Sequence, residues 1–232
     1  MQKLTFVIGA NAAGKTYFIE HHLANEKAVV LDVYDYQQKV YDEHGNKERI
    51  TFEEQFRCLK KANEKHLHDI INELKQGNDV IAEQTFFKAK RRIAYIDEIR
   101  NEMDVKIEVY VMHPSNERWM ENSKKRKSIE NIEVYEEQKK QIEFPNPAEE
   151  FDAIFEVIDD EIILRMDDIK PEIVKQARQE LTEEDTRIHR EDERKHNHHQ
   201  LIESMNTRPF WHYCEVCGKK EFITAKEALD AG

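Results

Sequence analysis

Short apolar runs alternate along the chain with longer amphipathic segments. The short runs are rich in Val, Ile and Leu, have the length of buried strands, and lie at residues 4–8, 28–31, 79–83, 105–112, 153–158 and 161–164. Apolar residues recur at helical spacing over about 51–76 and 88–101, and the charged segment 115–142 is also predicted to be helical. Strands that alternate with helices predict an α/β fold, in which a mainly parallel sheet forms the middle layer of a three-layer sandwich.

The C-terminal part of the chain has a different pattern. Pro171 stands where a helix often begins, and a charge-dense helix is predicted from there to about residue 199, with few apolar residues after Leu181. The following tail is aromatic and contains a pair of cysteines. We therefore expect a main domain at 1–165, a charged helical linker at 166–204 and a small cysteine-containing tail at 205–232.

The turn after the first apolar run carries the clearest chemical signal. Its sequence GANAAGKT matches the P-loop pattern G-x-x-x-x-G-K-[ST] at every fixed position, between a strand and a helix. Such a loop holds phosphate with inward backbone N–H groups and the positive end of the helix. Lys15 is expected to reach the β- and γ-phosphates of ATP or GTP, and the Thr16 hydroxyl to ligate Mg²⁺. The motif predicts the P-loop NTPase version of the sandwich, with the nucleotide bound by Gly9, Ala10, Asn11, Ala12, Ala13, Gly14, Lys15 and Thr16.

Acidic residues follow the second and third predicted strands. Parallel sheets bind ligands at the carboxyl ends of their strands, so Asp32, Asp35 and Glu83 are expected to converge on the P-loop. Phosphoryl transfer to a hydroxyl group uses a carboxylate that orients and deprotonates the acceptor. Asp35 is the first candidate for this base and Asp32 the second, while a helix N-cap or a solvated loop acid is the alternative for either. Glu83 is expected to hold Mg²⁺ through water or to bind the acceptor, unless it is a plain acid at the end of a strand.

Basic residues gather in two of the predicted helical segments. The run from Lys124 to Lys127 contains Arg126, which a closing lid could place over the transferred phosphoryl group. Arg118 lies near the same helix face and is expected to help bind the nucleotide. A solvated basic helix face is the alternative. The second group follows the third strand and is expected to form a local groove for an anionic acceptor or simply a charged helix start: Lys88, Lys90, Arg91 and Arg92.

Composition narrows the classes of function. Charged residues make up 36% of the 232 residues and the net charge is −12, which argues against a broad basic face for duplex DNA. No apolar run reaches the length of a membrane span, so no membrane partner is expected, and the N-terminus lacks a signal-peptide pattern. We therefore expect a cytoplasmic protein.

Cysteine usage also bears on the tail. The chain has 3 cysteines, Cys58, Cys214 and Cys217, and an odd count with one C-x-x-C pair is not a disulfide framework. Cys214 and Cys217 have the spacing of a zinc knuckle, but structural Zn²⁺ needs four ligands and the sequence has no second C-x-x-C. The alternatives are a Zn²⁺ site completed by other residues and a reduced pair without metal.

The combined motifs resemble the P-loop kinases of the polynucleotide 5′-hydroxyl kinase and zeta-toxin type over roughly residues 1–165. The similar segments are Asp35-Tyr36-Gln37, Val80-Ile81-Ala82-Glu83-Gln84-Thr85 with Arg91-Arg92, and Asn122-Ser123-Lys124-Lys125-Arg126. The resemblance implies that Asp35 is the general base and that Arg126 contacts the transferred phosphate. It also implies that Glu83 helps to bind the acceptor; Thr85, Arg91 and Arg92, which stand in the same segment, are expected to do so too. Gln37 and Glu83 depart from the family, which usually has Arg and Asp at these places.

The predicted function is therefore an ATP- and Mg²⁺-dependent kinase. Its expected acceptor is a hydroxyl group, first the 5′-hydroxyl of a nucleic acid or nucleotide, and alternatively a nucleotide sugar or another small metabolite. A nucleotide-binding switch or ATPase without an acceptor is the alternative outside the kinases. The tail resembles the first half of a zinc-ribbon-like module, and this resemblance assigns Cys214 and Cys217 as the first two ligands.

Overall fold

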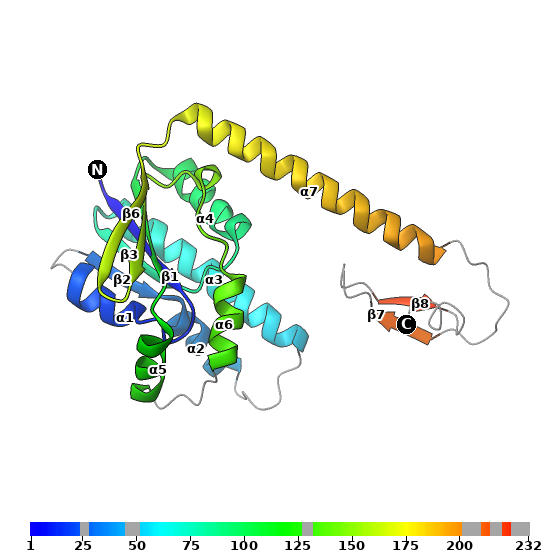
Figure 1. Cartoon of the computed structure of the whole chain (residues 1–232), viewed down its shortest axis with the longest axis horizontal. Helices are drawn as coiled ribbons and strands as arrows, with labels where there is room; N and C mark the ends of the chain where they lie inside the picture. The colour runs from blue at the N-terminus through cyan, green and yellow to red at the C-terminus, as the bar shows by residue number, and fades with distance from the viewer. Residues whose placement is uncertain (24–27, 45–51, 127–131, 201–209, 214–219, 224–232) are drawn as a thin grey trace. The chain divides into compact units, whose positions relative to one another are not determined.

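The computed structural model describes residues 1–23, 28–44, 52–126, 132–200, 210–213 and 220–223, and it divides the chain into two compact units, Met1–Ala177 and Arg178–Gly232. The strands of the first unit are β1 (Lys3–Gly9), β2 (Ala28–Asp32), β3 (Asp79–Gln84), β4 (Lys106–Met112), β5 (Ala153–Ile158) and β6 (Glu161–Asp167). Its helices are α1 (Lys15–Phe18), η1 (Ile19–Leu23), α2 (Val33–His44), α3 (Phe52–Lys75), α4 (Ala89–Glu102), α5 (Asn116–Lys125), α6 (Ile132–Gln141) and η3 (Pro147–Glu149) (Figure 1).

The first unit is built on one sheet of six strands in the order β2-β3-β1-β4-β5-β6. The pairs between β2 and β5 are all parallel, which confirms the predicted α/β fold with a mainly parallel sheet. β6 is antiparallel to β5, and Ile158 pairs with Glu161 across a two-residue turn. A turn this short can join only antiparallel strands, so this edge of the sheet departs from the parallel pattern.

Side chains alternate between the two faces of β1 and find a separate core on each. Leu4, Phe6 and Ile8 are buried in the larger core with residues of α3 and α4. Val7 lies in the core of the opposite face with Phe18 and Ile19, which α1 and η1 supply. The central strand is therefore buried on both sides, as expected of a parallel sheet inside a sandwich.

The helical part of the structure differs from the sequence prediction in two places. α2 was not predicted, because its few buried apolar side chains are isolated among polar residues: Val33 at its start, and Tyr36 and Val40, which pack on α3 beside Cys58 and Ala62. The segment 115–142 contains two described helices, α5 and α6, in place of one long helix.

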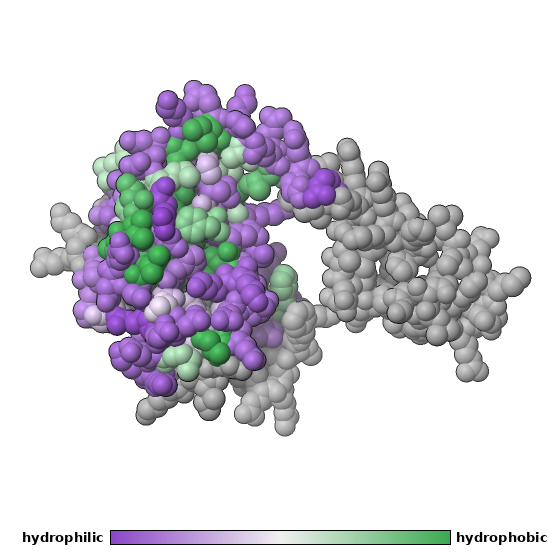
Figure 2. All heavy atoms as spheres, viewed as in Figure 1, coloured by the Kyte–Doolittle hydropathy of each residue, from purple (hydrophilic) through white to green (hydrophobic). Residues whose placement is uncertain are grey.

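The second unit contains most of α7 (Pro171–Gln200), which begins in the first unit, and the antiparallel pair β7 (Phe210–Tyr213) and β8 (Lys220–Ile223). Cys214 and Cys217 lie outside the described residues, so the Zn²⁺ site remains a prediction. Hydrophilic residues cover most of the visible face of the described chain (Figure 2), in keeping with its high charge. In the part of the chain that the structure describes, no helix has the length and apolar character needed to cross a bilayer.

Candidate functional site

The P-loop joins the C-terminal end of β1 to α1, and two glycines give it its path. Gly9 has φ 155°, and a Cβ atom there would lie 2.9 Å from Cβ of Met112 on the neighbouring strand β4. Gly14 forms the N-cap of α1 with φ 92°, a left-handed conformation that a side chain disfavours. These positions require glycine, so the motif has the backbone for which it was predicted.

Lys15 is turned into the loop. Its side chain is buried, and Nζ donates to the carbonyl oxygens of Gly9 at 3.3 Å and Ala10 at 3.1 Å. An ammonium group therefore lies among the main-chain groups of the turn. This arrangement fits a polyphosphate, which brings the negative charge that a buried cation needs.

Two carboxylates stand at the carboxyl ends of β2 and β3. Asp32 and Glu83 are direct partners in the register of these strands. The Thr16 hydroxyl lies 3.1 Å from each carboxylate oxygen of Glu83. Hydroxyl and carboxylate oxygens are the ligands that Mg²⁺ prefers, so Thr16 and Glu83 fit the predicted metal.

Burial raises the pKa of both acids. For Glu83 desolvation is the largest effect, and the charge of Lys15 opposes it. For Asp32 desolvation is again the largest effect, and it outweighs the hydrogen bond that the Tyr34 N–H donates to Oδ1 at 2.9 Å and the charges of Lys15 and Arg126. Asp32 is therefore within electrostatic reach of both cations of the site.

Asp35 lies three residues further, in the first turn of α2, with an exposed side chain. The two candidate bases therefore lie in different surroundings. Asp32 is at the end of β2 beside Glu83, and Asp35 is on α2. Asp32 also acts as the N-cap of α2 through its bond to Tyr34.

Arg126 reaches the P-loop from the C-terminal end of α5. Its Nη2 lies 3.5 Å from Oγ1 of Thr16. Arg118, near the start of the same helix, forms an ion pair with Asp160 at 3.1 Å. In this structure α5 is not an open lid, because the Trp119 side chain is fully buried against the domain.

A cavity of about 350 Å³ lies beside the P-loop. Gly14 and Thr16 line it on the loop side, and Arg118 and Arg126 line it on the α5 side. Its apolar walls include Met112. The cavity has the size, the apolar wall and the few polar groups of a small-ligand site, and it adjoins the residues predicted to bind the nucleotide.

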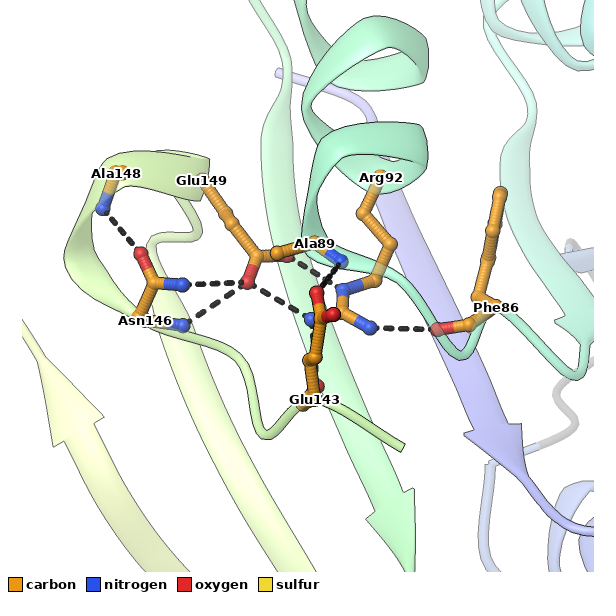
Figure 3. Close-up of polar contacts among 7 residues, drawn as sticks. All are labelled: Phe86, Ala89, Arg92, Glu143, Asn146, Ala148 and Glu149. Carbon is orange, nitrogen blue, oxygen red and sulfur yellow. Dashed lines mark hydrogen bonds and ion pairs between the residues drawn. The ribbon is translucent and has the colours of Figure 1, made fainter. Parts of the chain in front are cut away.

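The basic residues after β3 do not form one groove. Arg92 is buried with 1% of its surface exposed and forms a two-point ion pair with Glu149, from Nε at 2.5 Å and from Nη2 at 2.9 Å (Figure 3). It also donates to the carbonyl oxygens of Phe86 and Glu143. Lys88 forms an ion pair with Glu143 at 2.9 Å. The predicted contact of Arg92 with an acceptor therefore does not fit its place, because its donors already join three segments of the chain.

Two of the predicted acceptor residues remain on accessible positions. Arg91 is exposed in α4, and Thr85 is half-buried just after β3.

His66 of α3 is buried against the sheet. Its ring lies 2.7 Å from Gln84 Nε2 and 3.1 Å from the Leu31 carbonyl oxygen. Burial lowers the pKa of His66 to about 4, so the imidazole is neutral at pH 7.

We expect the Arg92–Glu149 pair to matter for stability and to be replaceable by apolar residues. Arg92→Met leaves the Glu149 carboxylate buried without its cation, which costs about 3–5 kcal/mol of unfolding free energy, and adding Glu149→Met should restore most of it. Urea unfolding measures both values. Lys75→Met is the matched control, because the Lys75–Glu102 pair is about half exposed and exposed ion pairs contribute little to stability. A loss below about 1 kcal/mol in Arg92→Met would contradict the structural role.

The structure gives a place to Asn122 of the predicted lid segment and adds three residues that the sequence did not indicate: Trp119, Gln138 and Tyr34. Trp119, Asn122 and Gln138 contact the backbone of the P-loop, and Tyr34 contacts the Asn11 side chain. The contacts of Trp119, Asn122 and Gln138 span more than 100 residues of chain. No local pattern could have found them, because each depends on how α5 and α6 pack.

A model of the AAA domain family, AAA_33, matches residues 4–145 of the chain. No curated protein sequence matches this chain. Three similar solved structures have low identity. A chain of the Pnkp1/Rnl/Hen1 RNA repair complex is 15% identical, with a TM-score of 0.44, 61% of this chain covered and 44% of that one. A sugar kinase from Janibacter is 14% identical, with a TM-score of 0.43 and coverage of 76% and 92%. A chain of the PezAT toxin–antitoxin system of Streptococcus pneumoniae is 14% identical, with a TM-score of 0.46 and coverage of 70% and 70%. This chain thus spans less than half of the matched RNA repair protein.

Proposed function

This chain belongs to the AAA domain family, and from that premise we propose that it is a phosphotransferase that moves the γ-phosphate of ATP or GTP to a hydroxyl group. One observation carries the proposal. Two cations, Lys15 and Arg126, meet the Thr16 hydroxyl and the carboxylates of Asp32 and Glu83 at one edge of the sheet. The second carboxylate, beside the one at the metal-binding hydroxyl, supplies the base that transfer to a hydroxyl group uses, and the acceptor screen below separates transfer from hydrolysis.

The residues divide into those that hold the nucleotide and those that act on the acceptor. The P-loop amides and Lys15 would hold the β- and γ-phosphates, and Thr16 with Glu83 would hold Mg²⁺, which when bound neutralises charge on the phosphates. The cavity lined by Arg118 lies where it could take the rest of the nucleotide. Arg126 would stabilise charge on the transferred group.

We assign Asp32 as the general base in preference to Asp35, the first candidate from the sequence. The acceptor O–H gives its proton to the Asp32 carboxylate, the acceptor oxygen bonds to the γ-phosphorus, and the bond from that phosphorus to the β–γ bridging oxygen breaks, which releases the nucleoside diphosphate. Support comes from the place of Asp32 beside Glu83 and from its electrostatic contact with Lys15 and Arg126. A raised pKa also makes a carboxylate a stronger base.

For the acceptor we propose a small hydroxyl compound, such as a nucleotide sugar or another metabolite. The observation that favours it is the withdrawal of Arg92 from the expected groove into its buried ion pair with Glu149, while Lys88 on the surface pairs with Glu143. The acceptor side also carries the negative charges of Asp32, Asp35 and Glu83, which oppose a polyanion. The 5′-hydroxyl of a nucleic acid is the second candidate, supported by the exposed Arg91.

An acceptor screen with γ-labelled ATP and GTP in the presence of Mg²⁺ tests the proposal. The panel contains a sugar nucleotide, free monosaccharides and an oligonucleotide with a 5′-hydroxyl end. Label on the sugar nucleotide or on a monosaccharide supports the small acceptor, and label on the oligonucleotide end supports the second candidate. Release of free phosphate alone, at a rate that the panel does not change, would replace the kinase with an ATPase or switch.

A further inference from the structure

We infer that Trp119 and Asn122 are positioning residues for nucleotide binding, which hold the outer side of the P-loop and fix Arg126 beside it. The inference rests on the proposed nucleotide site. It concerns α5, which the sequence suggested as a lid that closes over the phosphates. The contacts of α5 instead make it a permanent wall of the site.

Side chains of α5 hold two successive carbonyl oxygens of the P-loop. The indole N–H of Trp119 donates to the Asn11 carbonyl at 2.7 Å, and the Asn122 amide donates to the Ala12 carbonyl at 3.1 Å. A loop that turns its N–H groups inward to phosphate turns carbonyl groups outward. These carbonyls need donors when they are covered by protein, and α5 supplies them.

The loop conformation at this point needs such support. Ala12 has φ 58°, a left-handed conformation that is uncommon for a residue with a side chain. Conformations of this kind persist when the surroundings over-determine them. Here the carbonyls on both sides of the Ala12 N–Cα bond, those of Asn11 and Ala12 itself, are bonded to α5.

α5 is itself fixed by packing. Trp119 is 0% exposed, and its ring stacks on that of Tyr135 in α6 with centroids 4.7 Å apart. The Tyr135 hydroxyl donates to the Pro114 carbonyl just before α5 at 2.8 Å. From α6, the Gln138 side chain accepts the Asn11 N–H at 3.0 Å. Figure 1 shows α5 and α6 as separate labelled helices of the first unit. Side chains of both helices bond to the backbone of the P-loop.

The spacing along α5 connects the loop to the arginine. Trp119, Asn122 and Arg126 stand at positions i, i+3 and i+7, which lie on one face of a helix. The first two bind the loop carbonyls and the third reaches Thr16. One rigid face therefore sets the loop and the arginine relative to each other before any nucleotide arrives, which is how preorganised charge acts in catalysis.

The test uses variants of the full chain and MgATP as the probe. Trp119→Phe keeps a ring for the stack on Tyr135 but removes the donor to Asn11, and Asn122→Leu removes the donor to Ala12 at similar volume. Calorimetry with MgATP should show a dissociation constant about tenfold higher for each, as the loss of one hydrogen bond to a buried carbonyl implies. Met120→Ala, a partly exposed residue of the same helix, is the control and should bind within about twofold of the wild type.

A spectroscopic measurement separates positioning from folding. The chain has 2 tryptophans, so Trp211→Phe leaves Trp119 as the only indole. Titration with MgATP should change its emission in a saturable way, because its N–H partner belongs to the loop that binds phosphate. If Trp119→Phe does not fold, Asn122→Leu still tests the inference, because Asn122 is only partly buried.

The outcomes distinguish this inference from the proposed function. No binding of MgATP or MgGTP to the folded wild type would remove the proposed function. Wild-type binding together with unchanged affinity in Asn122→Leu and in folded Trp119→Phe would overturn only the positioning role.

Discussion

Lys15→Ala is expected to lower nucleotide-dependent transfer by about a hundredfold to a thousandfold, the range found when a preorganised group that stabilises transition-state charge is removed. Lys15 is buried in the turn with Nζ bonded to the Gly9 and Ala10 carbonyls. Alanine removes the one charged side chain of the loop, so the phosphates lose the cation that would neutralise them. The measurement is kcat/KM for release of nucleoside diphosphate with MgATP and with MgGTP, together with affinity from calorimetry.

The control for this change is Lys124→Ala. Lys124 is exposed near the end of α5, carries the same charge and lies outside the lining of the cavity. It should retain activity within about threefold, because single exposed charges have small effects. If Lys15→Ala kept more than a tenth of the wild-type rate, the role of the loop as a phosphate site would be wrong.

Asp32→Asn is expected to lower kcat by about two to four orders of magnitude, the usual contribution of a general base, with the affinity for MgATP nearly unchanged. Asparagine has the same shape and can still cap α2 by accepting the Tyr34 N–H, so the effect should be chemical and not structural. Asp35→Asn is the matched variant and should cost less than about tenfold, because Asp35 is exposed on α2. The reverse ranking would restore the base predicted from the sequence.

The pH dependence gives a second measurement of the same assignment. A base acts only when it is deprotonated, so kcat should rise as the pH increases through the Asp32 pKa and then level off. Burial raises this pKa, so the rise should lie above the ordinary aspartate value of 3.8. Any residual activity of Asp32→Asn should lack this rise. An identical acidic limb in the variant would exclude Asp32 as the titrating base.

The sequence predicted the sheet well because its evidence was local. Each strand of the sheet contains a short apolar run. Such runs, most clearly those of the almost fully buried β1, β3 and β4, can be recognised without knowing their neighbours. β6 is the exception to the parallel arrangement, because its direction is set by the two-residue turn at Asp159 and Asp160. The helix α2 was missed because its stability comes from contact of Tyr36 and Val40 with α3, and isolated polar helices of this length are marginal.

The site residues also fall into those that local sequence identifies and those that distant partners place. The P-loop was found because its glycines, lysine and threonine are adjacent in sequence and each has a backbone or ligand role of its own. The role of Arg92 was predicted wrongly from its neighbours, since its partner Glu149 lies 57 residues away. The choice between Asp32 and Asp35 depends on which of the two carboxylates lies beside Glu83. The register of β2 and β3 determines this, because it pairs Asp32 with Glu83.

The sequence alone therefore determined the α/β fold class, the phosphate loop and the edge of the sheet at which the chemistry is expected, because these follow from local periodicity and from adjacent residues. Only the tertiary structure decided that Arg92 is withdrawn into a buried ion pair, that Asp32 lies among the charges of the site, and that α5 is fixed to the loop through Trp119. The physical reason is that burial and charge contact are properties of segments brought together in space, and the free energy that selects them depends on partners far away in the chain.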